Sequence, residues 1–287
     1  MSNYRGMLKF AALAALPLAL NACGGGDDTG GAAAGGGAPA AAVEIQDPGS
    51  ISGTITFYGT APTNPTIDMR AEAACLEKHE GTPVQESVVV NDNGTLRNVF
   101  VYVKEGLTQS YPATGATPEI DQDGCVYEPR VLGVQPGQNL TIRNSDPVLH
   151  NVNARPTTNR GFNISQPQAG MTSERSFASP EIMIPVQCDV HGWMHAYIGV
   201  VDHPYFAVSG DDGSFRIENL PPGNYVLETW HEVYGTQTTP VTVPPNGNVE
   251  VDVGYREAMA ATAIVPLGQP IDLYEHHGDH AGEPATD

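Results

Sequence analysis

The sequence predicts an all-β protein built from two sandwiches, and three observations carry this prediction. Short runs of β-branched and aromatic residues recur along the chain, and clusters of turn residues separate them. The 32 glycines and 24 prolines disfavour a fold dominated by helices. Hydrophobic residues make up 40% of the 287 residues, which is enough to build a core.

The first 22 residues have the pattern of a secretory signal, in which basic residues precede an apolar run over 10–20. Residues 20–23 (LNAC) resemble a bacterial lipobox, in which the cysteine is lipidated and becomes the mature N-terminus. This resemblance implies a lipid anchor on Cys23, on a bacterial cell envelope and facing the periplasm. Gly24 stands where an acidic residue would favour the inner membrane, so we expect the outer membrane. The alternative is an ordinary signal peptide followed by an unrelated cysteine.

Residues 23–42 are nearly all glycine, alanine and aspartate, which predicts a flexible tether. The first sandwich is expected within 43–201, with one modest helix candidate at 69–78. The tetrapeptide 91–94 (NDNG) predicts a tight turn between two strands of a hairpin. The predicted strands are 51–58, 87–90, 96–103, 131–134, 140–143, 182–186 and 196–201.

A second, smaller sandwich is expected over 202–256. Turn residues at 211–213 (DDG) and 220–223 (LPPG) separate its segments. Residues 257–287 are acidic and lose the strand period, which predicts a disordered tail. The predicted strands of this part are 205–208, 215–217, 225–230, 241–243 and 249–253.

The charge balance excludes one class of partner. The chain has 33 acidic and 13 basic residues, for a net charge of −20. Binding to nucleic acid needs a basic surface, so we expect no nucleic-acid partner. We interpret the acidic residues as a solvated surface. No run of 18 apolar residues occurs, so we expect no transmembrane helix.

Cys75 and Cys125 lie outside any spacing typical of a metal site. In an oxidising compartment we expect them to form a disulfide that closes a loop of about 50 residues. Two alternatives remain open. They are a pair of free thiols, and a metal pair formed by Cys75 and His79.

Cys188 opens a segment whose residue types are those of a copper site. In 188–195 (CDVHGWMH), His191 follows the cysteine by three positions and Met194 by six. A tight loop between two strands would bring these three side chains together. His150 is the candidate for a second imidazole. Two histidines, one cysteine and a weak axial methionine are the type-1 copper set, and the alternative is a buried, inert cysteine with surface histidines.

Several neighbours are candidates for supporting roles. Asn151 is positioned to hydrogen-bond across to the Cys188 loop. We interpret Trp193 as a packing residue, with a cover over the metal as the alternative. His195 is interpreted as a surface histidine and is also an alternative ligand. The fallback axial candidates are Met171 and Met183.

With these residues the chain resembles the cupredoxins, and the loop spacing is most similar to that of amicyanin. The family pattern Cys-x-x-His-x-x-Met is matched by Cys188, His191 and Met194. His150 precedes Asn-Val, as the early ligand does in plastocyanin-like proteins. The resemblance covers about 85–201 and implies a Greek-key β-sandwich with one type-1 copper, held by three ligands on one loop and one on a distant strand.

The downstream part has its own resemblance. Residues 213–217 (GSFRI) and 220–225 (LPPGNY) look like a carboxypeptidase regulatory-like sandwich, whose members are usually non-catalytic folding or binding modules. Residues 202–256 are short for a complete sandwich. The strand at 51–55 resembles the first strand of that module, so the copper region is an insertion if this strand returns to complete it. Periodicity leaves this open.

The function expected from these resemblances is one-electron transfer between periplasmic redox partners. A site with four protein ligands lacks an open position for a substrate, so we expect no enzymatic activity. The edge of His191 is the expected exit for electrons, since a loop histidine can reach the surface. The alternative is a cell-envelope sandwich that binds a partner or holds copper without a redox role.

Overall fold

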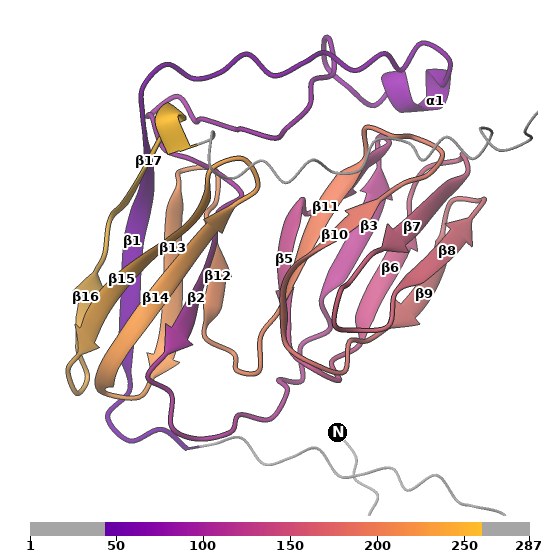
Figure 1. The fold of residues 1–287 in the computed structure, drawn as a ribbon. Coiled ribbons are helices and arrows are strands. Elements are labelled where there is room, and N and C mark those ends of the chain that lie inside the picture. Colours follow the sequence, from indigo (N-terminus) through magenta and orange to yellow (C-terminus); the bar gives the residue numbers. More distant parts are fainter. Residues whose placement is uncertain (1–43, 260–287) are drawn as a thin grey trace, which may run out of the picture. The chain divides into compact units, whose positions relative to one another are not determined.

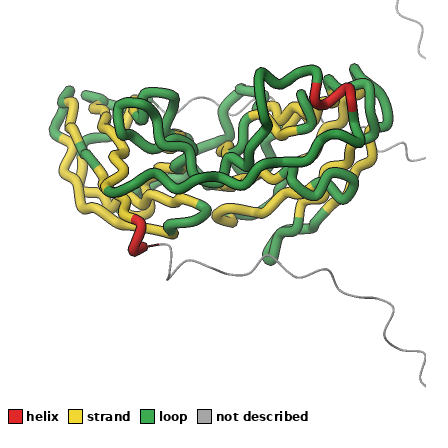
Figure 2. The backbone as a smooth tube through the Cα atoms, turned by 90° about the horizontal axis from the view of Figure 1, so that it is seen from above, coloured by secondary structure: helices red, strands yellow, loops and turns green. Residues whose placement is uncertain are grey.

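The computed structural model describes residues 44–259. The predicted signal, the predicted lipidation site Cys23, the predicted tether and nearly all of the predicted tail lie outside this part. Within it, strands dominate, and the two helices are short (Figure 2). The prediction of an all-β sandwich fold is confirmed. The described residues contain no helix that is both long and apolar enough to cross a membrane.

The first and last strands of the described chain build one sandwich together, which we call the host sandwich. One of its sheets has the order β13-β1-β16, with β17 also paired to β1, and the other has the order β12-β2-β14-β15. The strands are β1 (Gly49–Tyr58), β2 (Phe100–Glu105), β12 (Phe206–Val208), β13 (Ser214–Leu220), β14 (Gly223–His231), β15 (Gly235–Val243), β16 (Asn248–Glu250) and β17 (Val253–Arg256).

Strand β1 belongs to the host sandwich because its partners lie far downstream. It pairs antiparallel with β13, where Ile51 lies opposite Ile217. It also pairs parallel with β16 and β17. Its side chains alternate between the core and a more exposed face, as a strand with one buried face requires. The first strand therefore completes the downstream sandwich, which is the arrangement that periodicity had left open.

Strand β2 differs from its prediction in extent and in partners. The expected hairpin is reduced to an isolated bridge between Val90 and Leu96, and the regular strand begins at Phe100. β2 pairs with β12 and β14, so the expected boundary after residue 201 separates strands that are paired. Both faces of β2 are buried: Val101 contributes to the host core, and Phe100 to a separate apolar cluster. Successive side chains of β2 therefore contribute to two different cores, one on each face of the strand.

Between β2 and β12 the chain builds a second sandwich, which we call the inserted sandwich. Its sheets have the orders β5-β11-β10-β7-β8 and β4-β3-β6-β9. Buried aliphatic side chains from both sheets, such as Ile142 and Ile198, form its core. The strands are β3 (Glu119–Asp123), β4 (Val126–Glu128), β5 (Val131–Val134), β6 (Leu140–Asn144), β7 (His150–Ala154), β8 (Phe162–Gln166), β9 (Met171–Arg175), β10 (Glu181–Gln187) and β11 (His195–Val200).

A pair of glycines lies where β5 and β11 approach the host strands. Gly133 and Gly199 are opposite each other in the β5–β11 ladder. A Cβ on Gly133 would lie 2.3 Å from the Phe206 ring, and one on Gly199 would lie 2.7 Å from the Phe100 ring. The absence of side chains at this pair lets the aromatic rings lie directly on the backbone of the strands.

The segment between β1 and β2 extends to the inserted sandwich and returns (Figure 1). It carries α1 (Ala73–Leu76), which is only four residues of the helix expected at 69–78. Cys75 in this helix forms a disulfide with Cys125, across a sequence separation of 50 residues. The predicted disulfide is confirmed, and it ties this segment to the turn between β3 and β4. A short 3-10 helix, η1 (Glu257–Met259), ends the described chain.

Candidate metal centre

Two segments of the inserted sandwich meet at one end of the β7–β10 pair. His150 is the first residue of β7, and Cys188 directly follows β10. One ligand atom from each of His150, Cys188 and His191 lies within 4.8 Å of the others. The Nδ1 atoms of the two histidines are 2.9 Å apart. All three residues are buried. The structure thus brings together three of the four residues expected to bind the metal in one enclosed group.

The loop that carries Cys188 is closed by its own backbone. The Cys188 N–H donates to the Met194 carbonyl at 3.2 Å, and the Met194 N–H donates to the His191 carbonyl at 2.9 Å. The His191 N–H donates to Cys188 Sγ at 3.3 Å. These bonds make the tight turn that places a thiol and an imidazole on the same side. Met194, the fourth expected ligand, is buried in the core cluster that also contains Cys188.

Asn151 connects the two ligand-bearing segments. Its Oδ1 accepts the Asp189 N–H at 2.7 Å and the Cys188 thiol at 3.4 Å. Its amide nitrogen donates to the Asp189 carboxylate at 2.9 Å. A polar partner of this kind fixes the orientation of a ligand without binding the metal itself.

Sequence reasoning missed Asp146, a buried carboxylate behind His150. One of its oxygens lies 2.9 Å from His150 Nε2, on the side of the ring that faces away from His191. The carboxylate also accepts the N–H groups of Gly124 and Cys125 at 2.9 and 2.8 Å. Lys78 lies 2.8 Å from it. In the sequence the one available signal is an acid four residues before the candidate histidine.

Asp146, His150 and Cys188 stabilise one another's charged forms, as the directions of their pKa shifts show. Burial raises the pKa of Asp146, but hydrogen bonds from His150, Lys78 and two backbone groups outweigh it, so the pKa lies below its ordinary value. Burial alone would lower the pKa of His150. The hydrogen bonds to Asp146 and Cys188 outweigh the effect of burial, so the pKa of His150 lies above its ordinary value. The pKa of Cys188 is lowered because bonds from His150 and backbone N–H groups exceed the effect of burial. A lowered thiol pKa favours the thiolate, which is the form that binds metals.

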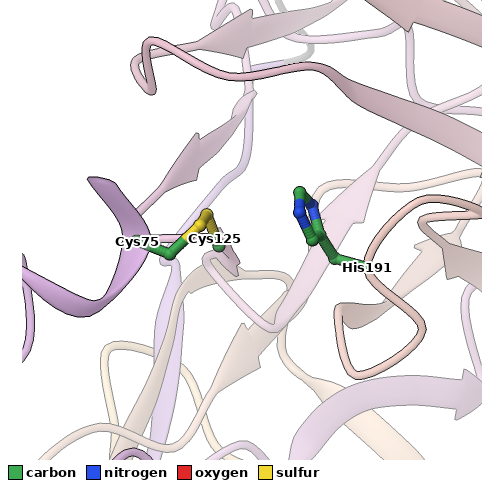
Figure 3. A group of neighbouring side chains, drawn as sticks. All are labelled: Cys75, Cys125 and His191. Carbon is green, nitrogen blue, oxygen red and sulfur yellow. A yellow bond between two sulfur atoms is a disulfide. The ribbon is translucent and has the colours of Figure 1, made fainter. Parts of the chain in front are cut away.

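His191 is not at the surface, so the expectation that this loop histidine reaches the surface is wrong. The residue is 3% exposed, and its burial is the main reason that its pKa lies below the ordinary value. The Cys75–Cys125 disulfide lies beside its ring (Figure 3). The Trp193 ring lies 5.0 Å from it on a centroid basis, and the Trp193 indole donates to the Cys125 carbonyl at 3.0 Å. The disulfide and the indole together cover the histidine.

The other candidate ligands lie outside this group. His195 pairs with Gln187 at the start of β11. Met171 begins β9 in the opposite sheet, and Met183 lies in the apolar cluster with Phe100. His79 Nε2 donates a hydrogen bond to the Gly124 carbonyl, while Cys75 is oxidised. The alternative metal pair of Cys75 and His79 is therefore wrong.

The donor chemistry of the group fits a soft or borderline metal ion. A thiol with a lowered pKa and two imidazoles converge, and a buried methionine closes the loop. Thiolate and thioether ligands select Cu(I), and imidazole suits copper in both of its common oxidation states. His150, Cys188 and His191 are all buried, which limits the access of water to their ligand atoms.

Comparison with known proteins identifies part of the host sandwich. Residues 195–256 match the family model of the carboxypeptidase regulatory-like domain. The matched range begins at β11 of the inserted sandwich. It leaves out β1 and β2, although these two strands pair with strands inside the matched range. A search of curated protein sequences found no match.

Three solved structures resemble this chain over about a third of its length. A purple cupredoxin from Nitrosopumilus maritimus is 21% identical, over 29% of this chain and 99% of its own, with a TM-score of 0.26. A copper-containing nitrite reductase from Thermus scotoductus SA-01 is 16% identical, over 33% of this chain and 24% of its own, with a TM-score of 0.27. A reduced amicyanin variant is 19% identical, over 31% of this chain and 85% of its own, with a TM-score of 0.27.

Proposed function

We propose that the protein is a type-1 copper protein that carries single electrons and is not an enzyme. One observation carries the proposal: His150 at the start of β7 forms a buried group with Cys188 and His191, which lie on the loop that Met194 closes. One copper ion per chain would supply a Cu(I)/Cu(II) couple there. In this proposal the fold is a Greek-key cupredoxin sandwich inserted into the carboxypeptidase regulatory-like module.

The residues around the group hold the ligands in place before any metal binds. Asp146 holds the His150 ring from behind, and Asn151 holds the cysteine loop. The loop backbone holds Cys188 against His191. A ligand set that is fixed by its surroundings moves little when an electron arrives or leaves, and this favours fast transfer. Cys188 would provide the thiolate, the two histidines the imidazoles, and Met194 the weak axial contact.

The location and partners of the protein are also part of the proposal. A lipid anchor on Cys23 would hold the chain on the periplasmic side of the cell envelope, with the outer membrane favoured by Gly24. Residues 23–42 would let the folded part reach a periplasmic or membrane redox partner. The net charge of −20 favours a partner with a basic face and disfavours nucleic acid.

Copper titration with visible spectroscopy tests this function. We expect the purified protein to bind one copper per chain, to become intensely coloured when oxidised, and to bleach reversibly with a mild reductant. Cys188→Ser should abolish the colour and leave the circular dichroism of the fold unchanged. Stoichiometric binding without colour would support the alternative, a sandwich that holds copper without a redox role.

The assignment of His150 has a separate test. His150→Gly should remove the colour, and added imidazole should restore much of it, because the other ligands remain in place. His195→Ala serves as the matched control and should leave the spectrum nearly unchanged. If His150→Gly keeps the colour and His195→Ala loses it, the proposed ligand set is overturned.

A further inference from the structure

The Cys75–Cys125 disulfide forms a second group of metal-ligand side chains directly outside the first. Its two sulfurs and one nitrogen of His191 lie within 4.8 Å of one another, and all three residues are buried (Figure 3). His191 Nε2 has no hydrogen-bond partner among the described residues. His191 is thus common to both groups, and one of its two ring nitrogens has no hydrogen-bond partner among the described residues.

This second group lies where the inner group is covered. Cys75 belongs to α1, and the segment around it is also held by Lys78, which pairs with Asp123 and Asp146. His79 adds a hydrogen bond to the Gly124 carbonyl at 2.7 Å. The ligands beneath are nearly or fully buried. The disulfide is the covalent link in this cover, so its oxidation state decides whether Cys75 stays joined to the β3–β4 turn.

The chemistry of the pair changes with its oxidation state. A disulfide sulfur is a poor metal ligand, whereas a thiolate is a strong one for soft ions. A dithiol reductant that delivers two electrons and two protons would open the S–S bond to two thiols and would itself become a disulfide. Two thiolates and one nitrogen of His191 then offer three ligands, a set that favours Cu(I).

We propose that the dithiol form of Cys75 and Cys125, together with His191, is a Cu(I) loading site through which the ion reaches the inner group. This rests on the proposed copper function. When Cu(I) binds, the two thiols each release a proton. When it passes inward, Cys188 releases one proton and the two outer thiolates are protonated again. A disulfide oxidant then takes two electrons and two protons from the pair, and the restored disulfide closes the cover.

The binding test uses Cys188→Ala, in which the inner group lacks its thiolate. The disulfide, dithiol and alkylated-dithiol forms of this variant are mixed anaerobically with Cu(I) held by a chromogenic chelator. We expect the dithiol form to withdraw one Cu(I) per chain, and the other two forms to withdraw at least tenfold less at the same chelator concentration. Equal withdrawal by the dithiol and disulfide forms would overturn the proposal. Far-ultraviolet circular dichroism verifies that the three forms share one fold.

The loading test uses the protein with Cys188 intact. Cu(I) is added to the dithiol form, to the disulfide form and to the double variant Cys75→Ser with Cys125→Ser, and colour is developed with an oxidant after set times. The dithiol form should load at least tenfold faster than both others. A double-serine variant that loads as fast as the dithiol would mean that the pair only blocks access, and would overturn the ligand role.

The two tests separate this proposal from the function beneath it. If no form becomes coloured at any time, the copper function fails. If all forms become coloured at the same rate, the copper function stands and the loading site fails.

Discussion

Asp146 is the residue that links the inner ligand group to the covering segment. Its carboxylate contacts His150, the backbone of Cys125 and the side chain of Lys78. It is fully buried, so its charge is weakly screened by water. In the proposed copper site, a buried negative charge beside the outer nitrogen of His150 would stabilise the more positive state of the metal.

Asp146→Asn should therefore raise the reduction potential of the copper-loaded protein. The amide keeps the shape but removes the charge, and we expect a rise of roughly 60 mV, which is about 1.4 kcal/mol for one electron. Protein-film voltammetry measures it. Asp123→Asn is the matched control, because it removes the exposed partner of Lys78 and should leave the potential nearly unchanged. Equal potentials in Asp146→Asn and the parent would show that the carboxylate does not tune the site.

Met194→Gln should lower the potential instead. The substitution replaces a weak thioether by a harder amide oxygen, which favours Cu(II). The same voltammetry measures the shift, and the visible spectrum should change with it. If neither responds, the axial position belongs to another group or to none.

The sequence predicted more of the candidate ligand group than of its surroundings. Cys188, His191 and Met194 share one short loop, so their spacing alone shows that they are neighbours. Asp146 and the disulfide lie on other segments of the chain than the Cys188 loop. No local sequence pattern predicts their contacts with His150 and His191. The cover over His191 could not be predicted for the same reason, since it depends on where α1 is tied down.

At the scale of elements, Glu181 at the start of β10 holds the loop that follows β7. Its carboxylate accepts the N–H groups of Thr157, Thr158 and Asn159 and two side-chain hydrogen bonds. Burial raises the pKa of Glu181, but these bonds outweigh it and lower the pKa from 4.5 to about 2. The carboxylate therefore stabilises the fold above its unfolded pKa, and this stability is lost as the pH falls through the folded pKa.

Glu181→Gln should reduce the free energy of unfolding by about 1–2 kcal/mol at pH 7. The difference from the parent should shrink as the pH falls from 4.5 towards 2, because the parent carboxylate then becomes protonated. Urea unfolding of the metal-free protein at several pH values measures both effects. Glu174→Gln, on the exposed face of β9, is the control and should change little. A difference that is constant with pH would exclude the charge as its cause.

The elements also show what periodicity can and cannot predict. The strands β1 and β14 follow from local alternation and turn residues, and they lie close to their predicted positions. The partners of β1 and β2 do not follow, because pairing depends on residues more than a hundred positions away. The residue pattern predicted a strand at 96–103, but it did not show that both faces of β2 are buried.

At the scale of the whole molecule, the glycine pair in β5 and β11 controls how closely the host aromatics approach the inserted sandwich. Gly133→Ala should cost about 1–3 kcal/mol, because its Cβ would overlap the Phe206 ring and force a shift. Thermal unfolding measures this cost. Gly115→Ala is the control, since no atom beyond its chain neighbours lies within 4 Å of the methyl group it would gain, and the stability should be nearly unchanged. Equal melting temperatures for the parent and Gly133→Ala would show that the ring moves aside freely.

The insertion has a consequence for the order in which the protein matures. Translation completes the strands of the inserted sandwich while β1 and β2 still lack partners such as Ile217 and Trp230. Pairing across such a separation is slow, and domains tend to fold as units from the N-terminal side. The inserted sandwich can therefore form first, and the host sandwich closes around its ends afterwards. Chains that stop before β13 would leave β1 as an exposed strand edge, which distinguishes an unfinished molecule from a complete one and favours its aggregation.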